Sequence, residues 1–306
     1  MIVRRGPAEA ADVDSLPPGT VRVFAPAKVN LFLEVHGKRP DGFHEIATLV
    51  LAVDLGDDLA ISPVETGDVA LTCDDPGLTV GPDNLVLKAA SRLRSETGCS
   101  LGAAIRLTKR VPWAAGLGGG SSDAAAALQG LNELWKLGLS VAELARIGAA
   151  LGSDVPFFLG GAAAWATGRG EVIAPLDVGR PLDLVLLKPA EGLGTADVYR
   201  RLTVPAEPKD GSAVRGALAA GDVDALGAGL FNRLQEPAFE LCPAAADWHR
   251  RLTEYGTAGA LLTGSGSCLF ALCRNPQEAR RVHDDLSSGQ PPGSPRPRTY
   301  LVRSRP

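Results

Sequence analysis

The chain has 306 residues, of which 45% are hydrophobic and 22% are charged, with a formal net charge of −4 at pH 7. This apolar fraction is ordinary for globular domains and excludes an intrinsically disordered chain. A slightly acidic chain with mixed charges has no basic field that would collect phosphates, so we expect no nucleic-acid partner. At about 150 residues per domain, the length predicts one large or two medium domains.

Cysteine usage and hydropathy indicate the compartment. The five Cys residues form no C-x-x-C pair and lie mostly in apolar segments, which favours free thiols in a reducing compartment. The four His residues show no metal-ligand spacing. No apolar run reaches the roughly 20 residues of a membrane span, and the N-terminus lacks the apolar core of a signal peptide. We therefore expect a cytoplasmic protein with no membrane partner.

The first third of the chain has the pattern of consecutive short strands. Between residues 21 and 73, segments rich in β-branched and aromatic residues alternate with Gly, Pro and Asp, which favours strands over helices. The predicted strands are 21–26, 29–37, 44–54, 59–63 and 68–73.

Helical periodicity alternates with strand patterns in the rest of the chain. Residues 84–98 place apolar side chains on one face and end at a glycine, which predicts a helix. A strand ending at Pro112 is followed by helices at 121–138 and 140–152, the second with Ser140 as its cap. The remaining predictions are a hairpin around 168–170, a buried strand at 182–189, helices at 195–202, 210–219, 222–236, 243–255 and 276–287, strands at 258–263 and 267–273, and an edge strand at 299–304.

Composition also predicts the domain organisation. Residues 1–19 have no sustained periodicity and predict a flexible lead-in, and the Gly-, Pro- and Ser-rich residues 287–297 predict a flexible connector. We expect an N-terminal domain at 20–180 and a C-terminal domain at 181–306.

The segment PWAAGLGGGSSDAAAAL, at 112–128, carries the strongest functional signal. A predicted strand leads into four glycines and two serines, and strong helix formers follow. Glycine lets backbone N–H groups approach an anion, and a helix start adds free N–H groups and the positive end of its dipole. The spacing matches neither a Walker A loop nor a G-x-G-x-x-G fingerprint. We interpret the segment as a phosphate cradle; the alternative is a glycine-rich turn without a ligand.

Two further segments carry residues suited to phosphoryl transfer. Lys28 and Asn30 lie two residues apart on a predicted strand and so on the same side of it. Asp154 stands in a short polar step between a helix and an apolar Phe-Phe pair. A kinase needs a carboxylate to accept a hydroxyl proton and a lysine to stabilise the transferring phosphate oxygens. Taken singly, an Asp in this setting is more often a turn or cap residue, and a Lys on a strand is more often a solvated edge residue.

Three segments taken together resemble the three motifs of the GHMP kinases. They are PAKVNLFLEVHGKRPDGFHEI at 26–46, PWAAGLGGGSSDAA at 112–125 and TGSGSCLFAL at 263–272, and the similarity extends over most of residues 21–275. The resemblance implies a two-domain α+β GHMP kinase fold, with a ribosomal-protein-like N-terminal domain and a ferredoxin-like C-terminal domain. It also implies a phosphotransferase that uses ATP and Mg²⁺.

The resemblance also implies roles for individual residues. It assigns the catalytic roles to Lys28 and Asp154, and the ATP phosphate loop to the glycine-rich segment. No Glu is positioned as a magnesium ligand, so the resemblance leaves Ser122, Asp154 and ATP with water as alternatives for holding the ion. The implied loop residues are Pro112, Trp113, Ala114, Ala115, Gly116, Leu117, Gly118, Gly119, Gly120, Ser121 and Ser122.

The D-G-F-H segment resembles the branch of the family whose substrate is a cytidine diphosphate derivative of methylerythritol. This implies phosphorylation of its 2-hydroxyl in isoprenoid biosynthesis, with Phe43 and His44 at the cytosine ring and Tyr199 on the ring's other face. Asn30 matches a substrate-side asparagine. The third motif closes on the phosphates through Gly264, Ser265 and Gly266.

Two alternatives remain open at this stage. A GHMP kinase of mevalonate, homoserine or a sugar would have no use for rings around a cytosine. A non-catalytic nucleotide-binding regulator would be expected to lack Lys28 or Asp154, and both are present. We expect a monomer or a weak homodimer.

Overall fold

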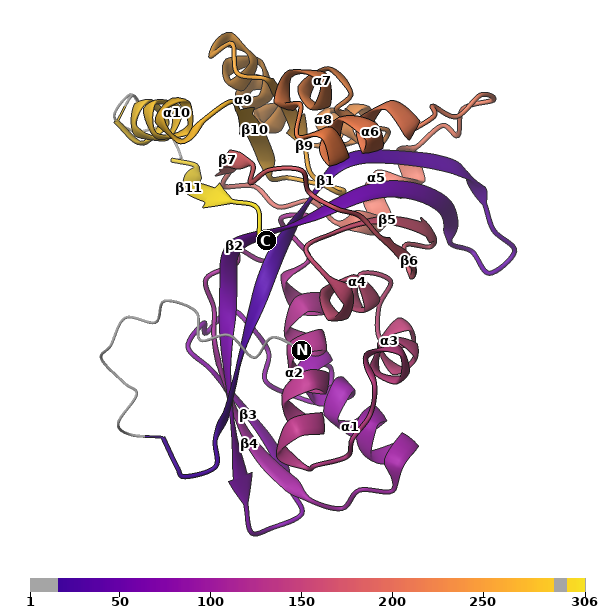
Figure 1. The fold of residues 1–306 in the computed structure, drawn as a ribbon, viewed down its shortest axis with the longest axis vertical. Coiled ribbons are helices and arrows are strands. Elements are labelled where there is room, and N and C mark those ends of the chain that lie inside the picture. The colour runs from indigo at the N-terminus through magenta and orange to yellow at the C-terminus, as the bar shows by residue number, and fades with distance from the viewer. Residues whose placement is uncertain (1–15, 289–295, 306) are drawn as a thin grey trace. The chain divides into compact units, whose positions relative to one another are not determined.

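The computed structural model describes residues 16–288 and 296–305 (Figure 1). The predicted lead-in and connector fall largely on residues 1–15 and 289–295, so these two predictions lie outside the described residues. The described chain forms two compact units that interleave along the sequence, and the predicted single boundary near residue 180 stays a prediction. The first unit takes 16–27, 56–111 and 118–160, and the second takes 28–55, 112–117, 161–288 and 296–305.

Two long strands replace four of the predicted short ones. They are β1 (Val21–Lys38) and β2 (His44–Val64), and each contributes residues to both units. The glycine and aspartates near residue 56 are typical of a turn, but here they lie inside β2. Gly56 faces the neighbouring backbone so closely that a Cβ would lie 2.6 Å from the carbonyl oxygen of Ala25. Asp57 is fully buried and accepts hydrogen bonds, so neither residue ends the strand.

The rest of the first unit follows the predicted alternation of strands and helices. β3 (Val69–Cys73) pairs in parallel with β4 (Gly102–Thr108), which pairs antiparallel with the second half of β2. The helices are α1 (Leu85–Thr97), capped by Asn84 and Gly98, α2 (Gly119–Leu134), α3 (Val141–Ala149), with a capping box at Ser140, and α4 (Val155–Gly160), which the sequence pattern did not predict.

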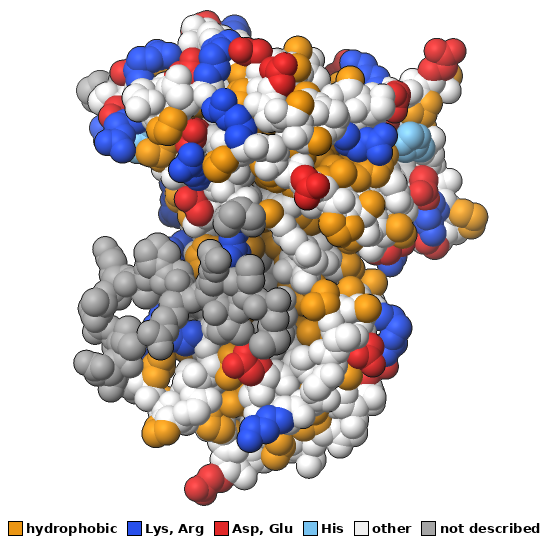
Figure 2. Space-filling model, in the orientation of Figure 1, with side chains coloured by type: hydrophobic (Ala, Val, Ile, Leu, Met, Phe, Trp, Pro, Cys, Tyr) orange, Lys and Arg blue, Asp and Glu red, His pale blue; other side chains and the backbone are white. Residues whose placement is uncertain are grey.

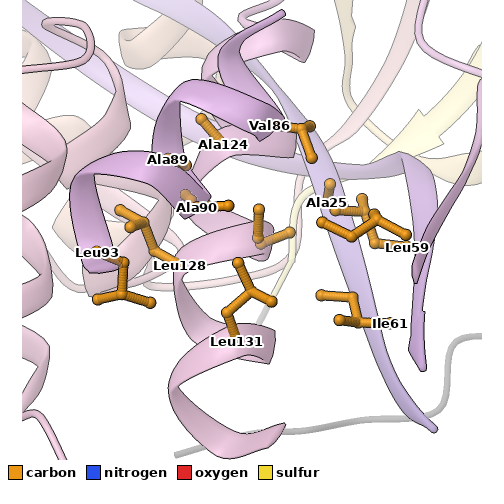
Figure 3. Close-up of a cluster of buried hydrophobic side chains, with 14 of the residues drawn as sticks. Ala25, Leu59, Ile61, Val86, Ala89, Ala90, Leu93, Ala124, Leu128 and Leu131 are labelled. Atoms are coloured by element: carbon orange, nitrogen blue, oxygen red, sulfur yellow. The ribbon is translucent and has the colours of Figure 1, made fainter. Parts of the chain in front are cut away.

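The core of the first unit lies between its helices and the buried face of its sheet (Figure 3). Small side chains such as Ala89 on α1 and Ala124 on α2 let the two helices approach each other closely. Larger residues such as Leu128, Leu59 and Ile61 fill the space towards the sheet. Each fully buried Leu or Ile contributes roughly 1.5–3 kcal/mol to the stability of the folded state. Because α2 is packed in this way, its start has a fixed place in the unit.

The second unit contains a four-stranded antiparallel sheet in the order β11-β7-β10-β9. The predicted buried strand is confirmed as β7 (Asp183–Lys188), and the predicted edge strand as β11 (Arg298–Arg303), drawn in yellow in Figure 1. Elsewhere in the unit, β2 pairs with β5 and β1 pairs in parallel with β8. The remaining elements are β5 (Ala163–Gly168), β6 (Val172–Pro175), α5 (Thr195–Arg201), α6 (Ser212–Ala220), α7 (Val223–Ala228), β8 (Phe231–Asn232), α8 (Gln235–Leu241), α9 (Pro243–Glu254), β9 (Gly259–Leu262), β10 (Leu269–Cys273) and α10 (Pro276–Ser288).

The single helix predicted at 222–236 is wrong. The segment divides into α7, the short strand β8 and the start of α8. The reason is long-range pairing: Phe231 and Asn232 pair with β1, almost 200 residues earlier in the chain. Helical periodicity in a short window carries no information about such a partner.

Surface charge and hydropathy agree with the composition. On the face shown in Figure 2, Lys and Arg side chains are interspersed with Asp and Glu over the described residues, without a large field of one sign. Among residues 16–288 and 296–305, no helix combines the length and the apolar character that a membrane span requires.

Candidate functional site

Lys28 and Asn30 lie side by side in a buried polar network of the second unit. The Lys28 residue is only 4% exposed, and its ammonium group donates to Oδ1 of Asn30 at 2.5 Å. The amide nitrogen of Asn30 donates to Oγ1 of Thr48 at 2.8 Å, and its backbone N–H donates to Oγ1 of Thr263 at 2.9 Å. The predicted placement of Lys28 and Asn30 on the same side of a strand is therefore confirmed.

Parts of all three sequence motifs meet within this unit. A Cβ at Gly264 would lie 3.2 Å from Nζ of Lys28 and 3.1 Å from the carbonyl oxygen of Gly116. Gly116 has a φ of 74°, and a Cβ there would lie 2.2 Å from the carbonyl oxygen of Thr263. Only glycine fits such a backbone conformation at this separation. The first half of the glycine-rich loop thus packs against the third motif, beside Lys28.

Asn232, which sequence analysis missed, holds the third motif in place. Its side-chain amide donates to the carbonyl oxygens of Leu262 at 2.7 Å and Gly264 at 2.8 Å. The next residue, Arg233, binds the buried carboxylate of Glu34 through two hydrogen bonds. Burial opposes ionisation of Glu34, but hydrogen bonds from Arg233 and from two backbone N–H groups outweigh it and lower its pKa. Asn232 of β8 is therefore bonded to Leu262 and Gly264, and Arg233, which follows β8, is bonded to Glu34 of β1.

The predicted base-binding rings also lie in the second unit. The ring of His44 stacks on that of Tyr199, with centroids 4.9 Å apart and an interplanar angle of 28°. Phe43 is 51% exposed, and the guanidinium group of Arg169 lies 4.7 Å from the centre of its ring. Burial, and then the charge of Lys38, lower the pKa of His44. Tyr199 thus faces His44 rather than Phe43, and the sandwich of a base between Phe43 and Tyr199 stays a prediction.

The second half of the glycine-rich loop forms the start of α2 in the first unit. Gly118 is the N-cap residue, with a φ of 71°, and no side chain caps the helix. Because the first N–H groups of a helix have no partner within it, those of α2 are suited to an anion. The hydroxyl of Ser122 and Oδ1 of Asp123 are buried without a hydrogen-bond partner, alone among the buried side-chain nitrogens and oxygens of the described residues.

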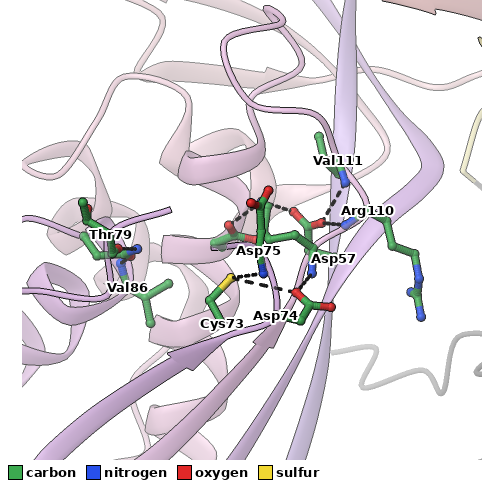
Figure 4. A network of polar contacts seen from close by, with 11 residues as sticks. Asp57, Cys73, Asp74, Asp75, Thr79, Val86, Arg110 and Val111 are labelled. Atoms are coloured by element: carbon green, nitrogen blue, oxygen red, sulfur yellow. Dashed lines mark hydrogen bonds and ion pairs between the residues drawn. The ribbon is translucent and has the colours of Figure 1, made fainter. Parts of the chain in front are cut away.

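A buried charge network that sequence analysis also missed lies at this helix start (Figure 4). Asp57 accepts the backbone N–H groups of Arg110 at 2.5 Å and Val111 at 2.8 Å. The ammonium group of Lys109 bridges Asp57 and Oδ2 of Asp123, the latter at 2.8 Å. Burial, reinforced by the neighbouring charge of Asp57, raises the pKa of Asp123 to about 7. The rarity of Lys, seven residues in the chain, was a signal that could have drawn attention to Lys109.

Asp154 immediately precedes α4 in the first unit and is partly exposed. The polar step that carries it lies next to the start of α2, because a Cβ at Gly152 would be 3.5 Å from Oγ of Ser121. The predicted base and the second half of the phosphate loop are therefore neighbours within one unit. The predicted cooperation of Asp154 with Lys28, which belongs to the second unit, stays a prediction.

The described residues fit a metal ion that is held mainly by a nucleotide. They contain no group of three or more His, Cys, Asp and Glu residues that could hold a metal. Mg²⁺ in kinases needs only one or two protein oxygens, because substrate phosphates and water supply the rest. The unpartnered Ser122 hydroxyl at the start of α2 is a protein oxygen of this kind.

Comparisons with known proteins agree with these motifs. Residues 84–162 match the family model described as GHMP kinases N terminal domain, and residues 214–291 match the one described as GHMP kinases C terminal. The 4-diphosphocytidyl-2-C-methyl-D-erythritol kinase of Pelotomaculum thermopropionicum is 44% identical over 264 residues, which cover 86% of this chain and 92% of that enzyme.

Solved structures support the same fold. A crystal structure of 4-(cytidine 5'-diphospho)-2C-methyl-D-erythritol kinase superposes with a TM-score of 0.77 and 36% identity, covering 93% of this chain and all of the other. Homoserine kinase from Cytophaga hutchinsonii superposes with a TM-score of 0.75 at 21% identity, over 94% of this chain and 95% of its own, which is a likeness in fold alone. The predicted two-domain α+β fold is therefore confirmed.

Proposed function

Because this chain belongs to the family of GHMP kinases, we propose that it transfers the γ-phosphoryl group of ATP to the 2-hydroxyl of 4-diphosphocytidyl-2-C-methyl-D-erythritol. The observation that carries the proposal is the 44% identity, over 86% of the chain, with a kinase named for that substrate. The reaction belongs to the methylerythritol phosphate route of isoprenoid biosynthesis. The homoserine kinase that superposes on this chain is only 21% identical, which is a likeness in fold and does not support that substrate.

Asp154 and Lys28 are assigned the chemical step. The substrate 2-oxygen attacks the γ-phosphorus of ATP, the bond from that phosphorus to the bridging oxygen of ADP breaks, and Asp154 accepts the hydroxyl proton. Lys28 stabilises the negative charge on the transferring oxygens. Its bond to Asn30 and the packing of Gly264 against it restrict the ammonium group to one position, so little reorganisation is needed during the reaction.

The glycine-rich loop is assigned to the nucleotide. The N–H groups at the start of α2 bind the phosphates, helped by the positive end of the helix dipole. Ser122 is the protein residue that we assign to Mg²⁺, because its buried hydroxyl has no partner in the protein. When bound with ATP, Mg²⁺ neutralises charge on the β- and γ-phosphates.

The substrate side is assigned to residues of the second unit. We assign the ring faces of Phe43, His44 and Tyr199 and the ring nitrogens of His44 to cytosine; the half-exposed ring of Phe43 supports this assignment. Asn30 is assigned to the part of the substrate near the reacting hydroxyl. The third motif, with Gly264, Ser265 and Gly266, is assigned to the side where the substrate meets the phosphates.

The cellular compartment, the oligomeric state and the partners of the enzyme belong to the same proposal. All five cysteines are free thiols, which supports a reducing compartment, and we place the protein in the cytoplasm. We propose that it acts as a monomer or a weak homodimer, on a small molecule, without a nucleic-acid or membrane partner.

A coupled assay of ADP release tests the function. The enzyme is supplied with ATP and Mg²⁺ and with one of four acceptors: the cytidyl substrate, its 2-deoxy analogue, mevalonate or homoserine. We expect ADP release only with the cytidyl substrate, and mass spectrometry should find one added phosphate on it. Turnover of homoserine or mevalonate at a comparable kcat/KM would replace the proposed substrate. Turnover of the 2-deoxy analogue would move the reaction to another hydroxyl.

A further inference from the structure

The triad of Lys109, Asp57 and Asp123 is buried to a degree unusual for three charged groups. Their side chains are 6%, 0% and 5% exposed. With all three ionised, the triad carries one excess negative charge. Replacing such a group with apolar residues is often neutral or stabilising in other proteins, so buried charges of this kind are weak evidence for stability. A role in fixing one arrangement of the chain accounts for them better.

The triad joins three segments that are distant in the sequence. Asp57 comes from the middle of β2 and binds the N–H groups of Arg110 and Val111, which follow β4. Lys109 belongs to the same stretch, and its backbone N–H donates to Oδ1 of Asp74 at 2.8 Å. Asp123 lies near the start of α2, immediately after its first turn. The bridge through Lys109 therefore ties the residues that follow β4 to the start of α2.

The ammonium group lies close to the helix end that has the free N–H groups. A Cβ at Gly119, the first residue of α2, would lie 3.4 Å from Nζ of Lys109 and 3.1 Å from Cγ1 of Val111. The two unpartnered buried oxygens, on Ser122 and Asp123, lie three and four residues further along the same helix. The triad is therefore adjacent to the end of α2 that we assign to the phosphates. It can fix the position of that end without contacting the nucleotide itself.

We propose that Lys109 is a positioning residue for the nucleotide: through Asp57 and Asp123 it sets where the N–H groups of the first turn of α2 point, and so sets affinity for the phosphates. The inference rests on the proposed function in one respect, that α2 binds ATP. A helix start displaced by about 1 Å presents its N–H groups at the wrong distance and angle, and such misplacements weaken binding and catalysis severely.

Calorimetric titration with ADP tests the proposal without any acceptor substrate. Lys109→Met keeps most of the unbranched side chain and removes the ammonium group that forms the bridge, and we expect ADP to bind at least about tenfold more weakly. The KM for ATP should rise by a similar factor, and the KM for the cytidyl substrate should stay within about twofold. A merely structural role would lower thermal stability and leave the ADP affinity of the folded variant unchanged.

Arg94→Met is the matched control in the same unit. Arg94 donates to the carbonyl oxygens of Gly67, Cys99 and Ser100 near the C-terminal end of α1, and so it also ties chain segments together. We expect this variant to lose stability and to bind ADP with wild-type affinity. An equal loss of ADP affinity in Arg94→Met and Lys109→Met would overturn the proposal, because general loosening of the unit would then explain both.

Asp123→Asn keeps the proposal testable if Lys109→Met does not fold. The substitution preserves volume and removes one of two carboxylates that repel each other, so the fold should persist while the bridge to α2 weakens. We expect ADP affinity to fall by a few-fold. Wild-type ADP affinity in this variant would overturn the proposal. A wild-type enzyme that binds ADP but does not phosphorylate the cytidyl substrate would count against the proposed substrate and leave the positioning role standing.

Discussion

The two units treat their buried polar groups differently. In the first unit, the start of α2 leaves two buried oxygens, on Ser122 and Asp123, without a partner. In the second unit, Lys28, Asn30 and Thr48 are joined by hydrogen bonds, and no buried side-chain nitrogen or oxygen among its described residues lacks a partner. An unsatisfied buried group costs about 1–3 kcal/mol, so it persists where a ligand completes it. The comparison supports our proposal of a nucleotide-binding end in the first unit and a rigid catalytic lysine in the second.

The largest effect is expected from the proposed proton acceptor of the first unit. Asp154→Asn keeps the shape of the side chain and removes its basicity, so kcat should fall by about 10²- to 10⁴-fold. ADP affinity should not change, because we assign the phosphates to the start of α2. Steady-state kinetics and calorimetry check the two parts. Activity within a few-fold of wild type would remove Asp154 from the mechanism.

Lys28→Met is the counterpart in the second unit. The substitution removes the charge assigned to the transition state, so kcat should fall by about 10²-fold. It also leaves Oδ1 of Asn30 without the ammonium group that binds it, so the unfolding free energy should fall as well. Kinetics and urea denaturation measure the two effects. A kcat equal to that of the wild type would contradict the assignment of Lys28 to the chemical step.

Alanine substitutions of Tyr199 and Phe43 test the proposed substrate-binding role of the second unit. Tyr199→Ala or Phe43→Ala should remove roughly 1–3 kcal/mol of base stacking, which is about a 5- to 150-fold rise in the KM for the cytidyl substrate. The KM for ATP should stay constant and serves as the internal control. Tyr199→Ala should also destabilise the fold more than Phe43→Ala, because Tyr199 stacks on His44 while Phe43 is half exposed. Unchanged KM values in two folded variants would place the cytosine elsewhere.

A matched pair of hydroxyl deletions tests the difference between the units directly. Thr48→Val removes a hydroxyl that accepts from Asn30 and donates to the carbonyl oxygen of Phe32, so unfolding free energy should fall by about 1–3 kcal/mol. Ser122→Ala removes a buried hydroxyl with no protein partner, so stability should stay the same or rise. Its KM for MgATP should rise. Urea denaturation that ranks the two variants in the opposite order would contradict the comparison.

Several features of the molecule follow from local sequence. The helix that begins after Asn84 and ends at Gly98 was predictable because cap residues act on N–H and carbonyl groups within one turn. The shared side of Lys28 and Asn30 follows from the two-residue period of a strand. The phosphate cradle could be inferred because glycines followed by helix formers have few other uses. The residues that carry out the proposed chemistry are therefore readable from motifs.

The tertiary structure decided which groups hold those residues in place. Lys109 and Asp57 are 52 residues apart, and Asn232 and Gly264 are 32 apart, so no local period relates them. β8 forms only because β1 offers it a partner, and β2 passes through its turn-like aspartates because Asp57 finds buried N–H groups to bind. Hydrogen bonds and ion pairs between distant segments depend on chain path, which local propensity does not encode. That is why local sequence patterns predicted the residues that we propose to react and missed the residues that we propose to position them.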